Sequence, residues 1–121
     1  MKVLILSCNT GGGHNSAALA AQDAFVQAGH EAVFLDVFSI ASQKLSGRVS
    51  RAYLFSTRLP FLFHLAYWAG KKVSRPGRQS PVYVANTLHA GRLYRYLQEH
   101  PFDVIVTTHL FAAEQLTCLK K

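Results

Sequence analysis

The hydrophobic pattern of the first third of the chain predicts a strand, a turn, a helix and a second strand. The first strand is expected over residues 2–7, because its centre is an uninterrupted apolar run, as in strands buried on both faces of a parallel sheet. After a glycine-rich turn, residues 14–28 carry small and apolar side chains at helical spacing. Gly29 ends this helix, and residues 32–36 follow as a second strand. The expected helix face consists of Ala17, Ala18, Ala21, Ala24, Phe25 and Ala28.

A third strand is expected over residues 102–107. It is followed by a loop at Thr108 and His109 and by a last helix over residues 112–119. A strand, a helix and a second strand in succession form a right-handed βαβ unit with parallel strands. The sequence therefore predicts an α/β fold, a Rossmann-like parallel sheet flanked by helices, with residues 1–121 forming one domain.

The middle of the chain has a less regular pattern. Residues 59–69 are almost wholly apolar, but eleven residues are too few to span a bilayer, which needs about twenty. A proline can open a helix, and His100 and Pro101 can close one. The elements expected here are a short helix over residues 38–45, a helix over 50–58, another from Pro60, a basic loop over 70–80, and one long helix over 81–99 with Ser80 as its cap.

Charge is distributed unevenly along the chain. The formal net charge is +7, yet residues 37–98 contain ten Lys or Arg and no Asp or Glu. The remainder carries three basic against six acidic side chains, so it is an ordinary acidic framework. A basic middle of this kind indicates an anionic partner, which is a nucleic acid, an anionic membrane or a phosphorylated substrate.

The turn after the first strand contains three consecutive glycines, Gly11, Gly12 and Gly13. Without Cβ atoms, their backbone N–H groups can approach a ligand closely, and the helix that follows directs its positive end at the same point. The turn is neither a dinucleotide fingerprint, because Ser16 stands at the third glycine position, nor a P-loop, because no Gly-Lys-Ser/Thr follows. We interpret it as a phosphate-facing loop, with a tight structural turn as the simpler alternative.

Two histidines are placed where chemistry is expected. His14 follows the glycines, and a neutral imidazole beside an anion site can take a proton from an attacking hydroxyl. His109 follows a predicted parallel strand, at the sheet edge where ligands gather in open α/β folds, although it can equally be a surface loop residue. We predict His14 as the catalytic residue, and Gly11, Gly12, Gly13, Asn15 and His109 as substrate- or diphosphate-binding residues.

The two cysteines, Cys8 and Cys118, are far apart in sequence and have no metal-ligand spacing. They are expected to be free thiols, and no metal site is predicted.

Aromatic side chains accompany the basic residues of the middle segment. Buried helices would explain many of them, but Trp and Tyr beside a polybasic stretch are also typical of an interfacial membrane anchor. The continuous apolar run favours a membrane over a nucleic acid, whose binding surface would interleave aromatic and charged residues more evenly. The predicted membrane-contact residues are Phe61, Phe63, Trp68, Lys71, Lys72, Arg75 and Arg78.

Residues 7–18, with Thr10-Gly11-Gly12-Gly13-His14 and Ser16-Ala17-Ala18, resemble the N-terminal motif of the monogalactosyldiacylglycerol synthase and processive diacylglycerol glucosyltransferase family. Residues 103–115, Asp-Val-Ile-Val-Thr-Thr-His-Leu-Phe-Ala-Ala-Glu-Gln, also resemble that family. The lipid II-forming N-acetylglucosaminyltransferases share a related glycine-rich turn that ends in His.

The resemblance implies the GT-B fold, in which two Rossmann-like domains face a cleft, the N-terminal one toward lipid acceptor and membrane, the C-terminal one binding the nucleotide-sugar. The three glycines would line the cleft, and His14 would be the base or a diphosphate contact. Asn9 stands where some relatives carry Asp, which departs from the pattern. The donor-binding domain is expected to be absent from residues 1–121, so this fragment is expected to be inactive alone.

The expected function is therefore that of the acceptor-side domain of an inverting glycosyltransferase, which moves a hexose from a nucleotide-sugar to a diacylglycerol-type lipid. The co-substrate would be a UDP-hexose, with no cofactor. The expected partners are an anionic membrane surface, the lipid acceptor, and a donor-binding domain or partner chain, with no nucleic acid. The expected location is cytoplasmic, peripheral on the inner face of the cell membrane. The alternatives are a non-catalytic basic module that docks on membranes or a partner chain, and the membrane-side half of a split or lipid II-type glycosyltransferase.

Overall fold

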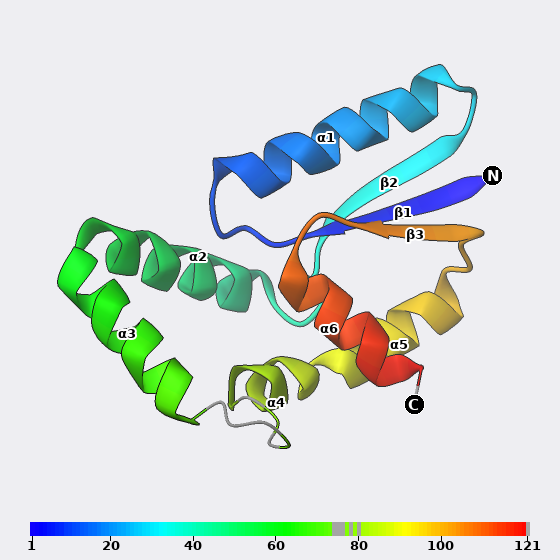
Figure 1. The fold of residues 1–121 in the computed structure, drawn as a ribbon. Helices are drawn as coiled ribbons and strands as arrows, with labels where there is room; N and C mark the ends of the chain where they lie inside the picture. The colour runs from blue at the N-terminus through cyan, green and yellow to red at the C-terminus, as the bar shows by residue number, and fades with distance from the viewer. Residues whose placement is uncertain (74–76, 78, 80, 121) are drawn as a thin grey trace.

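Three parallel strands form the sheet of the computed structural model, which describes residues 1–73, 77, 79 and 81–120, with only the backbone of residues 81 and 82 (Figure 1). The strands are β1 (Lys2–Ser7), β2 (Glu31–Asp36) and β3 (Val104–Thr107), in the order β2-β1-β3. In register, Leu4 lies between Val33 and Ile105. The predicted Rossmann-like parallel sheet is confirmed.

The central strand supplies the core on both faces of the sheet. Residues 3–6 of β1 have no exposed surface, and their side chains alternate between two apolar clusters. Val3 and Ile5 pack with Ala18 of α1 (Gly12–Gln27) on one face. Leu4 and Leu6 face the other layer, which contains α5 (Ala90–Glu99) and α6 (Leu110–Leu119). Figure 1 shows α1 on one side of the sheet and α5 with α6 on the opposite side.

The order of the strands creates a crevice at one edge of the sheet. The chain leaves β1 toward α1 on one face and leaves β3 toward α6 on the other, and β1 and β3 are neighbours. Where adjacent parallel strands send their following helices to opposite faces, the loops separate at the carboxyl ends of the strands. The loops after β1 and β3 therefore meet at the position where open α/β sheets bind ligands.

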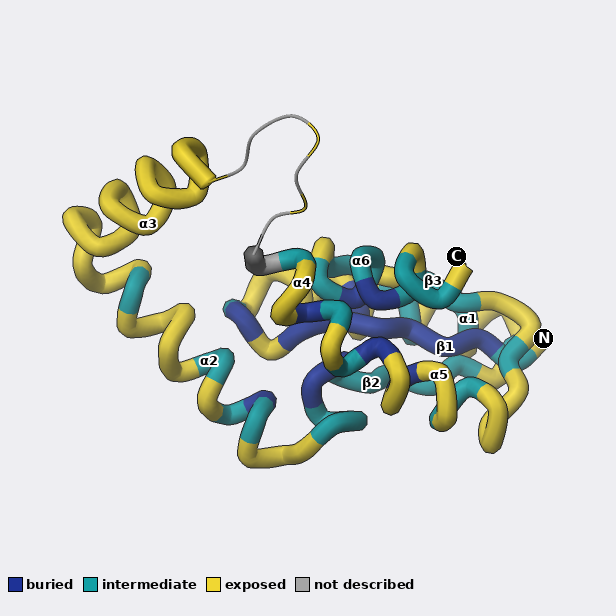
Figure 2. Tube along the Cα trace, turned by 90° about the horizontal axis from the view of Figure 1, so that it is seen from below, coloured by how far each residue is buried: buried dark blue, intermediate teal, exposed yellow. Residues whose placement is uncertain are grey.

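Two helices form an arm that extends away from the sheet (Figures 1 and 2). They are α2 (Gln43–Arg58) and α3 (Pro60–Val73), and we call them the α2–α3 arm. The chain turns between the two helices at Leu59, and no residue of α3 is buried. Figure 2 shows α3 exposed along its whole length. No helix within the described ranges combines the length and the apolar content needed to cross a bilayer.

The predicted single helix over residues 81–99 is wrong. The chain forms α4 (Pro81–Thr87) and α5, with a turn at Leu88 and His89 between them. The two helices pack on different partners. Asn86 of α4 donates to the carbonyl of Phe111 at α6, whereas Leu93 of α5 is buried in the core under the sheet. The Ser80 cap lies outside the described residues.

The predicted short helix over residues 38–45 is also wrong. Turns occupy this segment up to residue 41, and α2 begins at Gln43 with Ser42 as its N-cap. The cause is Asp36, whose carboxylate accepts from the N–H of Phe38 while its carbonyl accepts from the hydroxyl of Ser39. Such local side-chain bonds compete with helix formation.

Three further expectations differ in their boundaries. The apolar face of α1 is narrower than expected, because Ala18 is buried and Ala21 and Phe25 are half-buried, whereas the other three alanines of the expected face are exposed. The turn after β1 contains only one of the three glycines, Gly11, since α1 begins at Gly12. The expected basic loop begins later, because α3 continues to Val73.

Candidate functional site

Gly11 is the turning point between β1 and α1. Its φ of 138° and ψ of 162° are strained for any residue with a side chain, so the position requires glycine. It is also the N-cap of α1, and it has no side chain to cap the first-turn N–H groups. A Cβ built at Gly12 or Gly13 would meet no atom within 4 Å. The first turn of α1 is therefore open at Gly12 and Gly13, where an anionic group could approach the positive helix end, while a Cβ at Gly11 would lie 3.8 Å from the Tyr53 ring.

His14 stands in the first turn of α1 and reaches across to the loop after β3. Its Nδ1 lies 2.9 Å from the carbonyl oxygen of Thr108, and the Thr108 hydroxyl donates to the His14 carbonyl at 3.1 Å. Because a carbonyl only accepts, Nδ1 carries the proton, and Nε2 of the neutral ring is an acceptor. Nε2 makes no hydrogen bond to any described residue. His14 is exposed, so this nitrogen is available to a substrate.

His109 lies beside His14 at the start of α6. The two ring centroids are 4.4 Å apart in an edge-to-face arrangement. The Nδ1 atom of His109 accepts from the N–H of Phe111 and so caps α6. Its Nε2 lies 2.9 Å from the hydroxyl oxygen of Thr10, to which it donates. Both ring nitrogens are thus engaged within the protein, and the predicted diphosphate contact by His109 would require one of these bonds to break.

The environment of His109 favours its neutral form. Burial lowers the pKa of this imidazole, and the adjacent His14 lowers it further, while Asp36 acts in the opposite direction. The neutral ring is also the form that both hydrogen bonds require, because a protonated Nδ1 could not accept from Phe111. The neutral ring of His109 is therefore held in one orientation beside His14.

The side chain of Asn15 is hydrogen-bonded to the end of β1 and to the loop that follows it. Its Oδ1 accepts from the hydroxyl of Ser7 at 3.1 Å, and its Nδ2 donates to Oδ1 of Asn9 at 3.3 Å. The predicted role of Asn15 in substrate binding stays a prediction. Asn9 is exposed at the same loop.

The cysteines have no part in this chemistry. Cys8 and Cys118 are both free thiols, as predicted. Burial, followed by the charge of Asp36, raises the pKa of the Cys8 thiol to about 12, although a hydrogen bond with Thr10 acts in the opposite direction. Cys8 is therefore protonated and serves as a small apolar residue of the core. Within the described residues, no group of three His, Cys, Asp or Glu side chains could hold a metal ion.

Five of the seven predicted membrane-contact residues lie on α3 of the α2–α3 arm, well separated in sequence from the histidine pair. Phe61, Phe63 and Trp68 are 76%, 50% and 55% exposed on α3. Lys71 and Lys72 occupy its last turn, where Lys72 Nζ lies 4.1 Å from the Trp68 ring centroid. Arg75 and Arg78 lie outside the described residues.

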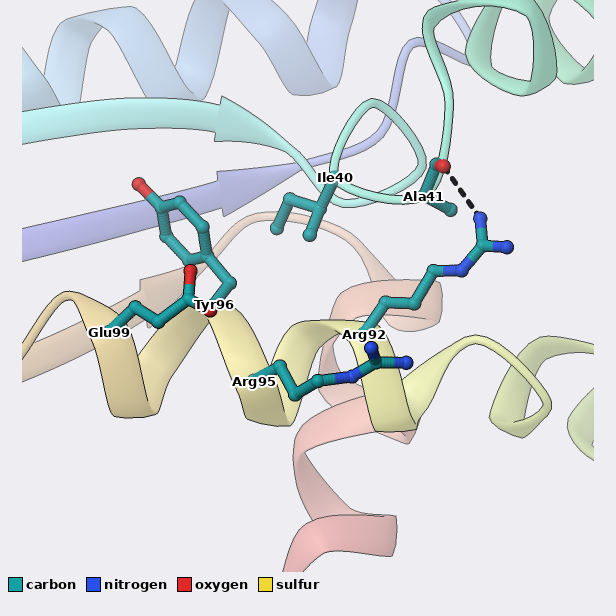
Figure 3. A pocket seen from close by; sticks show the side chains of 6 residues that line it. All are labelled: Ile40, Ala41, Arg92, Arg95, Tyr96 and Glu99. Atoms are coloured by element: carbon teal, nitrogen blue, oxygen red, sulfur yellow. Dashed lines mark hydrogen bonds between the residues drawn. The ribbon is translucent and has the colours of Figure 1, made fainter.

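A shallow pocket of about 350 Å3 lies between α5 and the turn after β2 (Figure 3). Arg92 extends from α5 and donates to the carbonyl oxygen of Ala41 at 2.6 Å. This bond fastens the turn to α5. Ile40 and Tyr96 form apolar parts of the lining, and Arg95 and Glu99 add one charge of each sign. Arg92 thus has a structural task here.

The sequence reasoning missed three residues that shape the site. Thr108 fixes the orientation of His14 and Thr10 binds His109, while Asp36 influences both His109 and Cys8. Thr10 and Thr108 flank the glycine turn and the third strand, so their position at the sheet edge was a usable signal. Asp36 also ends a predicted strand at that edge.

Comparisons with known proteins bear directly on this arrangement. A family model described as monogalactosyldiacylglycerol (MGDG) synthase matches residues 14–121. The match begins at His14 and extends through the loop after β3, so it contains both histidines of the site. Neither a search of curated proteins nor a search of solved structures found a match. The chain belongs to the MGDG synthase family, a family of glycosyltransferases that act on diacylglycerol lipids.

Proposed function

We propose that this chain is the acceptor-side domain of an inverting glycosyltransferase that transfers a hexose from a nucleotide-sugar to the hydroxyl of a diacylglycerol-type lipid. The observation that carries the proposal is the hydrogen bond from His14 Nδ1 to the Thr108 carbonyl, 2.9 Å long. In the neutral ring, this bond makes the exposed Nε2 the acceptor, at the crevice between β1 and β3. A general base requires such a nitrogen within reach of the hydroxyl that reacts.

In the proposed reaction, Nε2 of His14 takes the proton of the acceptor hydroxyl. The acceptor oxygen forms a bond to the anomeric carbon of the sugar as the bond from that carbon to the nucleotide diphosphate breaks, and the bonding electrons leave with the diphosphate. The first-turn N–H groups of α1, with no capping side chain at Gly11, are suited to stabilise negative charge. Thr108 and His109 act as positioning residues, because they hold and flank the His14 ring.

The proposal assigns contact with an anionic membrane surface to the α2–α3 arm. Neither α2 nor α3 contains an acidic residue, and together they carry six Lys or Arg. Lys or Arg near an anionic leaflet contribute on the order of 1 kcal/mol each. The large apolar side chains of α3 are exposed and free to insert among lipids. We place the protein on the inner face of the cell membrane, where anionic lipids provide the matching charge.

The donor side of the reaction belongs, in this proposal, to a second Rossmann-like domain or a partner chain. That part would hold the nucleotide-sugar, taken to be a UDP-hexose, and no other cofactor is invoked. The purified chain of residues 1–121 is accordingly expected to bind nucleotide-sugars weakly and to transfer no sugar. Micromolar binding of a UDP-hexose to this chain, measured by calorimetry, would contradict the placement of the donor site.

A non-catalytic membrane-docking module is the second candidate, since the exposed arm would serve it equally well. The two candidates differ at His14. In the enzyme assembled with its donor-binding domain, His14→Ala should lower turnover by about 10²–10⁴-fold, the range for loss of a general base. His14→Asn should lower it similarly, because an amide cannot take a proton at neutral pH.

The matched control is His30→Asn, in the turn between α1 and β2 at the opposite end of α1 from His14, and it should retain normal turnover. Normal turnover with weakened donor binding in His14→Asn would show that His14 contacts the diphosphate instead. Normal turnover and normal donor binding in both His14 variants would contradict the catalytic proposal and favour the docking module.

A further inference from the structure

A second recess lies between α2, α4 and the start of α6, on the face of the sheet opposite α1. It encloses about 280 Å3. Its walls come from segments far apart in sequence, the loop after β2, two turns of α2, the junction of α4 and α5, and α6. The lining residues are Phe38, Leu45, Val49, Ala85, Asn86, His89 and Phe111.

This recess is joined to the histidine pair by a chain of aromatic rings. The ring of Phe111, in its wall, has its centroid 4.8 Å from that of His109, which is 4.4 Å from that of His14. Phe38 packs against Phe111 from the other side, with centroids 5.9 Å apart. The Phe111 ring would thus separate a molecule in the recess from His109, and the His109 ring lies beside the proposed base, His14.

Asn86, one of the two polar side chains in the lining, offers almost no hydrogen-bonding capacity to the contents of the recess. Asn86 is 4% exposed and its amide is fully engaged. Its Nδ2 donates to Phe111 O and to Glu114 Oε2, both at 2.8 Å, and its Oδ1 accepts from Gln115 Nε2 at 2.9 Å. Gln115 Oε1 has no partner within the described part of the chain, but Gln115 does not line the recess.

The other polar side chain of the lining is His89. Its ring meets the Phe38 ring edge-to-face, with centroids 6.1 Å apart. A buried water needs two to four polar partners, so this lining suits hydrocarbon better than water or a polar headgroup. The volume lies just under the range of about 300–1,000 Å3 for small-molecule pockets, which fits one chain and not a whole lipid.

We infer that this recess holds one acyl chain of the lipid acceptor while the acceptor hydroxyl lies at His14. The inference rests on the proposed function, because it takes the acceptor to be an acyl lipid. Leu45 and Val49 line the recess from the first turns of α2, and the same helix leads to the exposed α3. A chain leaving the recess along α2 would therefore reach the surface that we assign to the membrane.

The test uses the whole 121-residue chain and a fluorescent single-chain probe, 11-(dansylamino)undecanoic acid. Ala85 lines the recess from α4, and its neighbour Val84 is 46% exposed and does not line it. Ala85→Phe should weaken probe binding at least tenfold, because the added ring fills the recess. The matched control Val84→Phe should bind as the unmodified chain does. Phe61→Ser, on α3, should also leave this binding unchanged, and dioctanoylglycerol should compete with the probe.

A thermal melt establishes that each variant is folded, and Val49→Phe fills the recess from its α2 wall if Ala85→Phe does not fold. Absence of probe binding, or equal binding by the filled and unmodified chains, would overturn the inference and leave the role of His14 untouched. Conversely, His14→Asn should leave probe binding unchanged. Sensitivity to Ala85→Phe together with normal turnover of the His14 variants would uphold the acyl pocket and refute the proposed mechanism.

Discussion

Residues 3–6 of β1 have no exposed surface, whereas α3, which is also rich in apolar side chains, buries none of its residues. The loops around the sheet are joined by side-chain hydrogen bonds, such as those between His14 and Thr108. The arm instead combines exposed aromatic rings with Lys and Arg and contains no acid. Large exposed apolar patches with a charged rim mark interaction sites. The comparison suggests that one set of apolar residues maintains the fold and that the other meets a partner.

The largest expected contrast is in stability. Leu4→Ala removes a fully buried side chain from the core and should lower the free energy of unfolding by about 2–5 kcal/mol. Leu65→Ala makes the same chemical change on α3, where Leu65 is 49% exposed, and should change it by less than about 0.5 kcal/mol. Urea unfolding of both variants measures the difference. Equal losses would show that α3 belongs to the folded core.

The second contrast concerns membranes. Replacing Phe63 and Trp68 together by Ser should weaken binding to anionic vesicles by at least about hundredfold, because each large apolar side chain contributes about 1.5–3 kcal/mol when it becomes buried. The melting temperature should stay nearly unchanged, since both side chains are exposed in the free protein. Vesicle sedimentation and a thermal melt give the two values. A lower melting temperature with intact vesicle binding would reverse the assignment.

A smaller effect is expected from charge alone. Replacing Lys71 and Lys72 by Gln should weaken binding to anionic vesicles about thirtyfold at low salt, from roughly 1 kcal/mol per charge. The difference should vanish near 1 M salt, where the screening length is about 3 Å. Binding curves of the unmodified chain and the variant with anionic vesicles, at low salt and at about 1 M salt, measure this difference. Equal affinity of the unmodified chain for neutral and anionic vesicles at low salt would refute the electrostatic contribution.

The smallest effect concerns the pH dependence of stability around His109. Its pKa in the folded chain is lowered by burial and by His14, whereas in the unfolded chain it is about 6.5. As the pH falls through about 6.5, His109 takes up a proton in the unfolded chain before it does so in the folded chain. The free energy of unfolding therefore decreases as the pH falls. His109→Asn keeps a capping oxygen and removes the titration, so this variant should lose less stability between about pH 7.5 and 5.5. An identical acid sensitivity in both proteins would contradict the lowered pKa.

Local pattern was sufficient to predict the sheet and the placement of the two histidines relative to it. The apolar run of β1 and the glycine turn placed His14 correctly at a helix start, and the third strand placed His109 at the same edge. Those features depend on residues adjacent in sequence. The bond from His14 to Thr108 joins residues 94 positions apart, so no local pattern indicates it.

The features that the sequence did not predict correctly, or left open, are those that depend on tertiary contacts. The break between α4 and α5 follows from Asn86 binding α6 while Leu93 packs under the sheet, and a periodicity that continues through residue 88 conceals it. From composition alone, the aromatic residues of the arm could be either buried or exposed. Only the structure, in which no residue of α3 is buried, distinguishes the two.

The central claim, that the sheet edge performs the chemistry and the α2–α3 arm provides the membrane contact, is tested most directly by one ratio in the assembled enzyme. That ratio is turnover on diacylglycerol in anionic vesicles divided by turnover on soluble dioctanoylglycerol. Replacing Phe63 and Trp68 by Ser should lower the ratio at least tenfold, because access to vesicles is lost while His14 and its Thr108 contact remain. An unchanged ratio, or equal loss of turnover on both acceptors, would contradict the account.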